Sequence, residues 1–360
     1  MAFGIINNLF VGSFEDGNGK DDGYDISNLH FDFEVSRSIK WYENYAKYKI
    51  YNASLDTIEH ILYEGAGIIH EYGYSDEAKS AYEKVGVGNA GVGNIFVGNV
   101  SKAWCERIGN NVVTHLVCTS TRGPEYQLTK VPLALAFKSG TDVLTILKTV
   151  ADWCAMPLIG ADSLADVFID DDFSYSGSST KACLKTINAL LDSIGAGKVY
   201  FDNSVMVYMD DTGNEQDQQM ITNVSLDYSS GLISASPVRE NDDGLLRKDV
   251  EQNLAYYYFG GVSPVNTKMG KSGKGKKANE FTYDKNIEYK PIADAADRRK
   301  KVKFRSLVNP GLVPNTRVNI DNSGESLPMP VVKGSFLIRS VTFKGNNYGG
   351  ACEAEGEAVE

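Results

Sequence analysis

The sequence has few of the residues from which disulfide frameworks and metal centres are built. Its five cysteines are odd in number and include no C-x-x-C pair, and its four histidines have no metal-ligand spacing. We therefore expect neither a disulfide framework nor a zinc site. The thiol content fits folding in a reducing cytoplasm.

Long apolar runs are missing as well. No stretch approaches the roughly 18 apolar residues of a membrane-spanning helix, so stable insertion into a membrane is not expected. The opening residues, MAFGIINNLF, carry no basic region, and we expect no signal peptide.

Catalytic signatures are equally scarce. There is no G-x-S-x-G nucleophile elbow, and Ser178-x-x-Lys181 lacks the S-D-N and K-T-G partners of penicillin-recognising enzymes. The run Asp170 to Asp172 could supply catalytic carboxylates, but consecutive residues of an extended chain point to opposite sides. We expect no catalytic residues and no enzyme.

Two glycine-rich runs resemble phosphate-binding loops in composition. GKSGKGKK (270–277) has no buried strand before it, and Lys277 takes the place of the magnesium-binding Ser or Thr. GVGNAG (86–91) precedes a strand, whereas dinucleotide binding requires a helix there. We expect no nucleotide, no other cofactor and no metal.

The residues that are abundant favour β structure. The chain has 20 Tyr and 35 Gly, with 42% hydrophobic and 23% charged residues. The last two values are ordinary for a packed globular protein, and the Tyr-rich, strand-prone composition leans toward sheets.

Charge is distributed unevenly along the chain. The formal net charge is -11, but residues 261–310 hold 13 Lys/Arg and 5 Asp/Glu, a net of +8, which leaves -19 for the remainder. The acidic balance argues against non-specific binding of nucleic acid by the whole surface. The basic segment is either a solvated loop or a contact for an acidic partner. The candidate contact residues are Lys268, Lys271, Lys274, Lys276, Lys277, Arg298 and Arg299.

The periodicity of apolar residues predicts three domains. Residues 1–130 and 223–360 are strand-rich, and each is assigned to a β domain. Residues 131–222 are assigned to a small α/β domain with two helices and a hairpin. The fold class is thus mainly β with an α+β insert.

The two helices of the middle domain have recognisable ends. The first follows the capping-box signature Ser139-x-x-Asp142. The second is predicted to begin near Ser178 or Ser179 and to stop at Gly195, before a hairpin that turns near Asn203.

The sequence pattern also predicts positions for two histidines and the three tryptophans. His70 and His115 alternate with strand residues, which predicts surface positions on a sheet. The three tryptophans, Trp41, Trp104 and Trp153, are interpreted as core or interface anchors.

The last third of the chain repeats the first in outline. KYKIYNAS, GAGIIHEY and a hairpin in the first third are matched by KVKFRSLV, TRVNIDN and a second hairpin. We place the two hairpin turns at Gly109–Asn111 and Gly345–Asn347, both Gly-Asn-Asn. The agreement in order, turn chemistry and strand period predicts two related β domains flanking the α/β unit.

Several segments resemble the baseplate hub proteins of long-tailed bacteriophages. The family pattern S-L-x-N-P-x-L-x-P-G-x-x-V is matched by SLVNPGLVPNTRV (306–318), except that Asn315 replaces the usual Gly. The terminal FLIRSVTFKGNNYGGACEAEGEAVE carries the family's G-(D/N)-x-x-G turn. FKSGTDVLTILKTVADW resembles its middle domain, and IFVGNVSKAW its first barrel, so the resemblance covers most of the chain.

The resemblance implies a structural protein of the virion, a homotrimeric ring at the tail tip that is assembled in the host cytoplasm. It also implies that residues 1–130 and 223–360 are each a tube-like β-barrel domain. Two barrels per chain, repeated three times, would adapt a six-fold tail tube to a three-fold central spike. The implied partners are the tail tube protein, the central spike protein, baseplate wedge or distal tail subunits and the tape measure protein. An acidic lumen would let genomic DNA pass without specific binding.

Two other classes of function stay open. One is a tail-associated β protein that binds a receptor or carbohydrate through exposed aromatic residues. The other is a cell-wall glycan hydrolase, for which Asp170 to Asp172 would supply the carboxylates.

Overall fold

The computed structural model describes residues 4–12, 23–39, 44–61, 66–74, 92–120, 133–154, 156–178, 180–209, 223–238, 301–323 and 331–358. The strands of the first part are β1 (Ile5–Gly12), β2 (Gly23–Asp25), β3 (Phe31–Ser38), β4 (Tyr45–Tyr51), β5 (Gly67–Tyr74), β6 (Gly93–Ile108) and β7 (Asn111–Thr119), with helix α1 (Leu55–Ile61) between β4 and β5. The middle part holds β8 (Leu133–Phe137), α4 (Val143–Trp153), β9 (Leu158–Ile159), η3 (Asp162–Asp166), β10 (Phe173–Gly177), α5 (Thr180–Ser193), β11 (Lys198–Asp202) and β12 (Val205–Met209). The last part holds β13 (Asn223–Leu226), η5 (Tyr228–Ser230), β14 (Leu232–Val238), β15 (Lys301–Leu307), β16 (Arg317–Asp321), β17 (Lys333–Asn346) and β18 (Gly349–Ala358).

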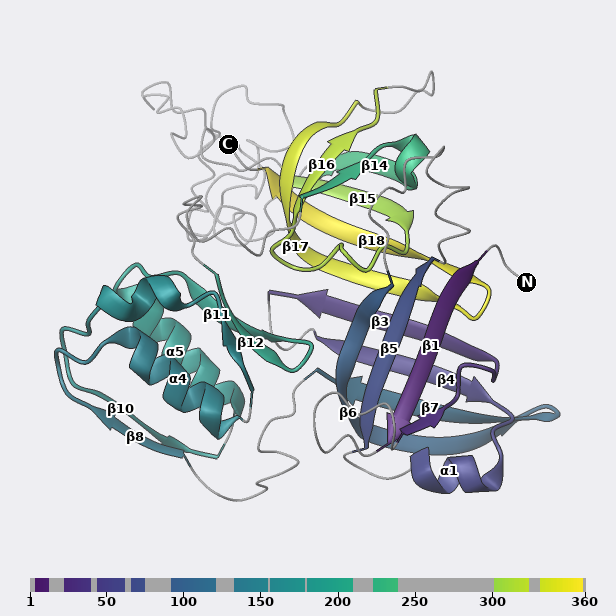
Figure 1. The fold of residues 1–360 in the computed structure, drawn as a ribbon, viewed down its shortest axis with the longest axis horizontal. Helices are drawn as coiled ribbons and strands as arrows, with labels where there is room; N and C mark the ends of the chain where they lie inside the picture. Colours follow the sequence, from purple (N-terminus) through teal and green to yellow (C-terminus); the bar gives the residue numbers. More distant parts are fainter. Residues whose placement is uncertain are drawn as a thin grey trace, which may run out of the picture. The chain divides into compact units, whose positions relative to one another are not determined.

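Thirteen of the described strands form one continuous, curved sheet (Figure 1). Its path runs β14-β15-β18-β17-β3-β4-β7-β6-β5-β1-β2, and β16 and β13 branch from β17. The protein is therefore mainly β, as predicted, and the first and last thirds of the sequence share one sheet.

The two ends of the chain have the same strand order. The neighbours β3-β4-β7-β6-β5-β1 in the first part are repeated as β14-β15-β18-β17-β16-β13 in the last part. β4 and β15 have the same length and the same alternation of buried and exposed residues. One difference is that β1 runs antiparallel to β5, whereas β13 runs parallel to β16. The repeated order relates the two β-rich ends, as predicted, and their division into two separate domains stays a prediction.

The hairpin turns correct part of the reasoning behind that prediction. Ile108 pairs with Asn111, and Asn346 pairs with Gly349, so the second turn consists of Asn347 and Tyr348. The triplet that begins at Gly345 lies too early to match the first turn, because Gly345 still pairs within the ladder. The equivalence of the two hairpins comes from pairing, not from the shared triplet.

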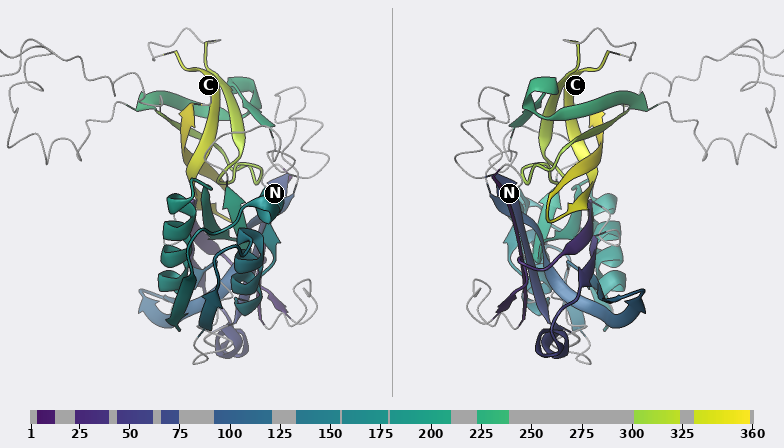
Figure 2. Two further views of the ribbon diagram at one scale, coloured as in Figure 1. Left: turned by 90° about the vertical axis from the view of Figure 1, so that its left-hand side faces the viewer. Right: turned by 90° about the vertical axis from the view of Figure 1, so that its right-hand side faces the viewer.

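The insert contains two helices that lie side by side (Figure 1, Figure 2). Helix α5 packs against β10 and β11, and α4 packs against β9 and η3. Asp142 is the N-cap of α4 and accepts a hydrogen bond from the backbone N–H of Thr145 at 2.7 Å. The cap is thus Asp142 itself, not Ser139 three residues earlier.

The predicted end of the second helix and the predicted hairpin turn of the insert are confirmed. The chain after α5 turns at Gly195, whose φ of 67° favours glycine. The β11–β12 hairpin turns at Asn203 and Ser204, with φ of 48° and 63°. Asn315, where the hub pattern has Gly, adopts φ of 67°, a conformation that Asn tolerates better than most residues.

Buried apolar residues form two separate cores. One is built from both ends of the chain, and the other is built from the helices and strands of the insert. The predicted domain boundaries at residues 130 and 222 stay predictions, because both residues lie outside the described ranges.

Candidate assembly interface

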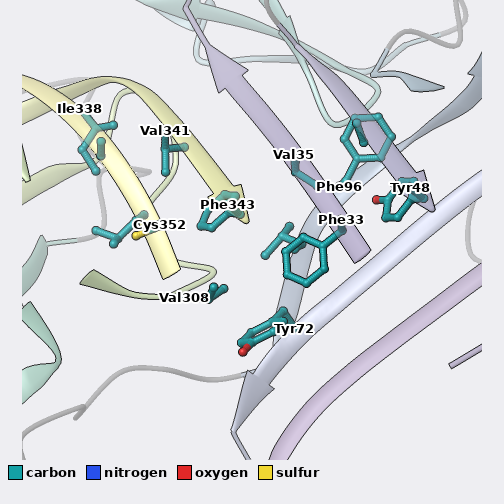
Figure 3. Close-up of a cluster of buried hydrophobic side chains, with 14 of the residues drawn as sticks. Phe33, Val35, Tyr48, Tyr72, Phe96, Val308, Ile338, Val341, Phe343 and Cys352 are labelled. Carbon is teal, nitrogen blue, oxygen red and sulfur yellow. The ribbon is translucent and has the colours of Figure 1, made fainter. Parts of the chain in front are cut away.

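The first and last parts of the chain meet along one pair of strands. The distal half of β17 runs antiparallel to β3, from Ser340 opposite Ser38 to Asn346 opposite Asp32. Phe343 of β17 lies opposite Val35 of β3, and both side chains are completely buried (Figure 3). Removal of these apolar surfaces from water stabilises the junction.

Gly345 allows the close approach of strands at this junction. A Cβ atom there would lie 2.7 Å from the Cα of Gly350 and 3.0 Å from the ring of Phe33, which is opposite Gly345 in the register. Only glycine fits without displacement of backbone, both within the β17–β18 hairpin, to which Gly350 belongs, and across the junction to Phe33.

Asn347 at the tip of the β17–β18 hairpin holds the chain that leads into β3. Its side-chain amide donates to the carbonyl oxygens of Ser27 (3.1 Å) and Leu29 (2.6 Å), and its Oδ1 accepts from Phe31 N at 2.6 Å. This one side chain therefore satisfies three backbone groups of the other half of the protein.

The insert is joined to β3 by a buried ion pair. The Arg37 guanidinium donates to both carboxylate oxygens of Asp202, at 2.8 and 2.5 Å, and the two side chains are only 5% and 9% exposed. Next to it, Val97 N donates to Asn203 Oδ1 at 3.1 Å, and Ser204 N donates to Ser120 O at 2.9 Å. The tip of the β11–β12 hairpin is thereby tied to the first β part.

Several strand edges have no neighbouring strand among the described residues, and they include those of β14 and of the distal half of β6. β14 ends the sheet order, so one of its edges is open. β5 pairs with β6 only from Gly93 to Asn99, which leaves the distal half of β6 paired with β7 alone. Open edges present unpaired N–H and C=O groups that favour addition of another strand.

Large apolar side chains are exposed beside these open edges. Ile108 and Trp104 on β6 are 51% and 45% exposed, and Ile233 on β14 is 43% exposed. The Trp104 indole stacks on His115 with 4.8 Å between ring centroids, and His115 Nε2 lies 2.7 Å from Glu106 Oε1. Aromatic and aliphatic side chains exposed at a strand edge are typical of a surface that another protein covers.

The face of the sheet that points away from the core carries alternating rows of charge. Lys301 and Lys303 on β15 pair with Glu357 and Glu355 on β18, at 3.7 and 4.0 Å. Glu34 on β3 lies between two lysines of neighbouring strands. Acidic and basic strands thus compensate each other across this face.

Glu34 illustrates that compensation. Its partial burial alone would raise the pKa, but a hydrogen bond from Tyr45 and the cations Lys344 (3.4 Å) and Lys47 (3.6 Å) outweigh it and lower the pKa of this carboxyl. Glu34 is therefore ionised at neutral pH and is held by its neighbours.

The residues proposed from sequence as partner contacts lie outside the described ranges. They are Lys268, Lys271, Lys274, Lys276, Lys277, Arg298 and Arg299. The runs 270–277 and 86–91 and the residue Trp41 lie outside them as well. The electrostatic contact stays a prediction.

The surface position predicted for His70 is wrong. His70 is completely buried, its Nε2 lies 2.7 Å from Asn7 Oδ1, and its Nδ1 lies 3.2 Å from the Tyr48 hydroxyl. Burial lowers the pKa of His70 to about 3, so the ring is neutral. The alternation of apolar and polar residues correctly predicts a strand. It does not reveal that β5 is buried on both of its faces.

The candidate carboxylates are not arranged as a catalytic pair. The Asp172 carboxylate accepts from Lys138 Nζ at 2.7 Å and from Ser139 N at 3.0 Å, and these bonds lower its pKa. A carboxyl held in its ionised form is a poor general acid. Asp170 and Asp171 are exposed beside it.

Within the described residues, no group of three or more His, Cys, Asp or Glu side chains is placed to hold a metal ion. All five cysteines fall in these ranges as free thiols, and only Cys105 is exposed. None of the described helices has the length and apolar character needed to cross a membrane.

Sequence comparison and structure comparison give different results. No protein-family model matches the chain, and no curated protein sequence matches it. Among solved structures, the 43 kDa tail protein of prophage MuSo2 from Shewanella oneidensis aligns with a TM-score of 0.53 and 11% identity, over 98% of this chain and 97% of that one. The tail protein from Neisseria meningitidis MC58 aligns with a TM-score of 0.53 and 9% identity, over 99% and 97%.

A third alignment extends the comparison beyond phage. A chain of the lidded Francisella PdpA-VgrG complex matches with a TM-score of 0.50 and 10% identity, over 98% of this chain and 52% of that one. At such low identity these alignments establish the architecture alone. The chain has the fold of phage tail proteins.

Proposed function

We propose that this protein is a structural component of a phage tail, the baseplate hub, which forms a homotrimeric ring between a six-fold tail tube and a three-fold central spike. The observation that carries the proposal is the repeated strand order, β3-β4-β7-β6-β5-β1 and β14-β15-β18-β17-β16-β13, within one chain. The shared fold with two phage tail proteins supports the same class.

The repeat matters because it changes the symmetry that a ring can present. Three copies of a chain with one module can offer three equivalent contacts, but three copies of a chain with two equivalent modules offer six. A ring of this kind can meet a six-fold partner on one face and a three-fold partner on the other. Tail tube and central spike proteins are the partners that such an adaptor requires.

The charge pattern bears on passage of DNA through the ring. With the polar face of the sheet lining the channel, the ion pairs Lys301–Glu357 and Lys303–Glu355 would make the wall nearly self-compensated. Passage would then rest on the pairing of these lysines with carboxylates, which competes with their binding of phosphate, rather than on the acidic wall that composition suggested. The Lys268–Lys277 segment would contact an acidic tail partner.

The alternative functions receive less support from the geometry. Asp172 is bound by Lys138 and Ser139, as expected of a structural carboxylate rather than the acid of a glycan hydrolase. The exposed aromatic Trp104 stacks on a neighbouring histidine at a strand edge, where it suits a protein contact better than a sugar platform.

Light scattering of the purified full-length chain tests the proposal. A ring of three copies has a mass of about 118 kDa, three times the protomer mass of 39.4 kDa. A chain that remains a protomer at micromolar concentration, both alone and in the presence of its tube and spike proteins, would rule out the ring.

A further inference from the structure

The pairing of β3 with β17 inside one chain shows how their counterparts in the repeat, β14 and β6, could pair between two chains. β3 and β14 occupy equivalent places in the repeat, as do β17 and β6. β3 is covered by the distal half of β17, whereas β14 and the distal half of β6 have no such neighbour among the described strands. The two open edges are the two sides of the same junction.

The hairpins give the residue alignment on one side. Each hairpin has one irregularity in its pairing, between Val100 and Lys102 in β6 and between Ile338 and Ser340 in β17. From that irregularity to the turn, β6 runs from Lys102 to Ile108 and β17 runs from Ser340 to Asn346, so the two stretches have the same length. Ile108 therefore corresponds to Asn346, and Cys105 to Phe343.

A backbone hydrogen bond gives the alignment on the other side. Leu307 N donates to Gly231 O at 2.9 Å, and Tyr51 N donates to His30 O at 2.9 Å. Leu307 and Tyr51 are the last residues of the equivalent strands β15 and β4. Gly231 therefore corresponds to His30, and Ile233, two residues on, corresponds to Asp32.

We propose that the open edge of β6 pairs antiparallel with β14 of a second copy of this chain, with Ile108 opposite Ile233 of the neighbouring copy. This inference rests on the proposed ring and defines its contact. The register is taken from the internal junction, where Asn346 lies opposite Asp32.

The backbone of β6 is prepared for this pairing. Ile108 and Asn111 close a two-residue turn, so the N–H and C=O groups of Ile108 and of alternate residues before it bond to β7. The groups of Ala103, Cys105 and Arg107 then point to the open edge. Their equivalents in β17 are Val341, Phe343 and Gly345, which are paired with β3.

The side chains fit the same register. Ile108 and Ile233 are 51% and 43% exposed in the single copy, and a direct cross-strand pair would bury both. At the next position the internal junction sets Gly345 against the large Phe33. In the proposed contact, Arg107 takes the place of Gly345 and Ser234 takes the place of Phe33. A large side chain would again lie opposite a small one, but on the other strand.

A second copy is favoured over an unrelated strand because both sides of the contact are on this chain. The two edges are different, so the contact is head-to-tail, and each copy would use one edge toward each neighbour. Repetition of such a contact through the three copies of the proposed ring would cover the open edges of β6 and β14 in every copy. A strand from another tail protein would fill one edge and leave the other exposed.

Disulfide crosslinking tests the register. In a Cys105→Ser background, Ile108→Cys and Ile233→Cys are combined in one full-length chain and oxidised with glutathione disulfide. Residues directly opposite at a position between ladder hydrogen bonds have Cα atoms about 4.5 Å apart, within the range that a disulfide spans. We expect covalent dimers and trimers on a non-reducing gel.

The matched control combines Ile233→Cys with Val112→Cys, which is 40% exposed but lies on β7, one strand farther from the open edge. We expect at least about tenfold less covalent product, because Cα atoms more than about 7 Å apart cannot be bridged. Circular dichroism confirms that each variant is folded.

A charge pair provides a second, independent readout. Ile108→Lys should lower the fraction of the ring measured by light scattering, and addition of Ile233→Glu should restore it. A ring of three copies without crosslink or rescue would overturn the register but leave the proposed function standing. A chain that forms no ring alone or with its tail partners would overturn both.

Discussion

The hairpins β6–β7 and β17–β18 share their register shift and turn positions but have opposite surroundings. Phe343 of β17 is completely buried against β3, whereas its equivalent on β6, Cys105, is exposed. The Asn347 side chain in the second turn forms hydrogen bonds with three backbone groups. Its equivalent Gly109 has no side chain, and its carbonyl oxygen accepts a hydrogen bond from Arg107 Nε. One backbone unit is thus a buried junction in one place and an open edge in the other. The difference marks the surface that a second copy would cover in the proposed ring.

The largest expected effect compares two equivalent strand positions, Phe343 on β17 and Cys105 on β6. Phe343→Ala should lower the free energy of unfolding by about 3–5 kcal/mol, because it empties a completely buried site. Cys105→Ala should change it by less than about 0.5 kcal/mol in the protomer. Denaturant titration followed by tryptophan fluorescence measures both. Equal costs would mean that the two hairpins are not in opposite surroundings.

The next effect concerns the ion pair that β3 makes with the insert. Asp202→Asn keeps the shape of the side chain but leaves the buried Arg37 guanidinium without its counter-charge, at a cost of about 3 kcal/mol. The exposed pair Lys303–Glu355 provides the control, since Glu355→Gln should cost less than about 1 kcal/mol. Comparable losses for the two substitutions would show that the buried pair does not tie the insert to β3.

A smaller effect separates the two turns. Asn347→Ala leaves Phe31 N and two carbonyl groups without their partner, and we expect a loss of about 1–2 kcal/mol. Asn110→Ala at the exposed equivalent of Tyr348 should be nearly neutral. Thermal unfolding distinguishes them, and a neutral Asn347→Ala would contradict the role given to that side chain.

The pH dependence sharpens the comparison within the core. The unfolded chain protonates His70 near pH 6.5, but the folded protein does so only near pH 3. The contribution is fully present above pH 6.5 and is lost as the pH falls, by about 1.4 kcal/mol per pH unit.

His70 lies opposite Phe96 of β6, and Ile320 lies opposite Gly334 of β17, each four residues before the residue that precedes the register shift. Ile320 is therefore the counterpart of His70 in the repeat and does not titrate, so a His70→Gln variant is the comparison. Between pH 6.5 and pH 5.5 its unfolding free energy should fall less than that of the unchanged protein, by about 1 kcal/mol. Parallel pH profiles for the two proteins would mean that His70 is not held in its neutral form.

Local patterns could be predicted from the sequence because local forces decide them. Helix α4 has its apolar face and an Asp at its start, and the β11–β12 hairpin has an Asn at a position of positive φ. Strand alternation in β4 and β15 was visible in the same way. These features need no knowledge of distant partners.

Features that depend on distant partners could not be predicted. The alternation FDFEV marks β3 as a strand, but nothing in those residues identifies β17, some 300 positions later, as its neighbour. The prediction of a surface position for His70 is wrong because residues from elsewhere in the chain cover the second face of β5. The shared Gly-Asn-Asn triplet was aligned at the wrong offset, although the repeat that it suggested is real.

Electron microscopy of the purified protein, viewed down the ring axis, tests the central claim that one chain supplies two equivalent modules. The account predicts class averages with three-fold symmetry and six similar densities around the channel, joined by the β6–β14 contact between copies. Averages with three densities, or a ring whose first and last thirds have unrelated outlines, would contradict it.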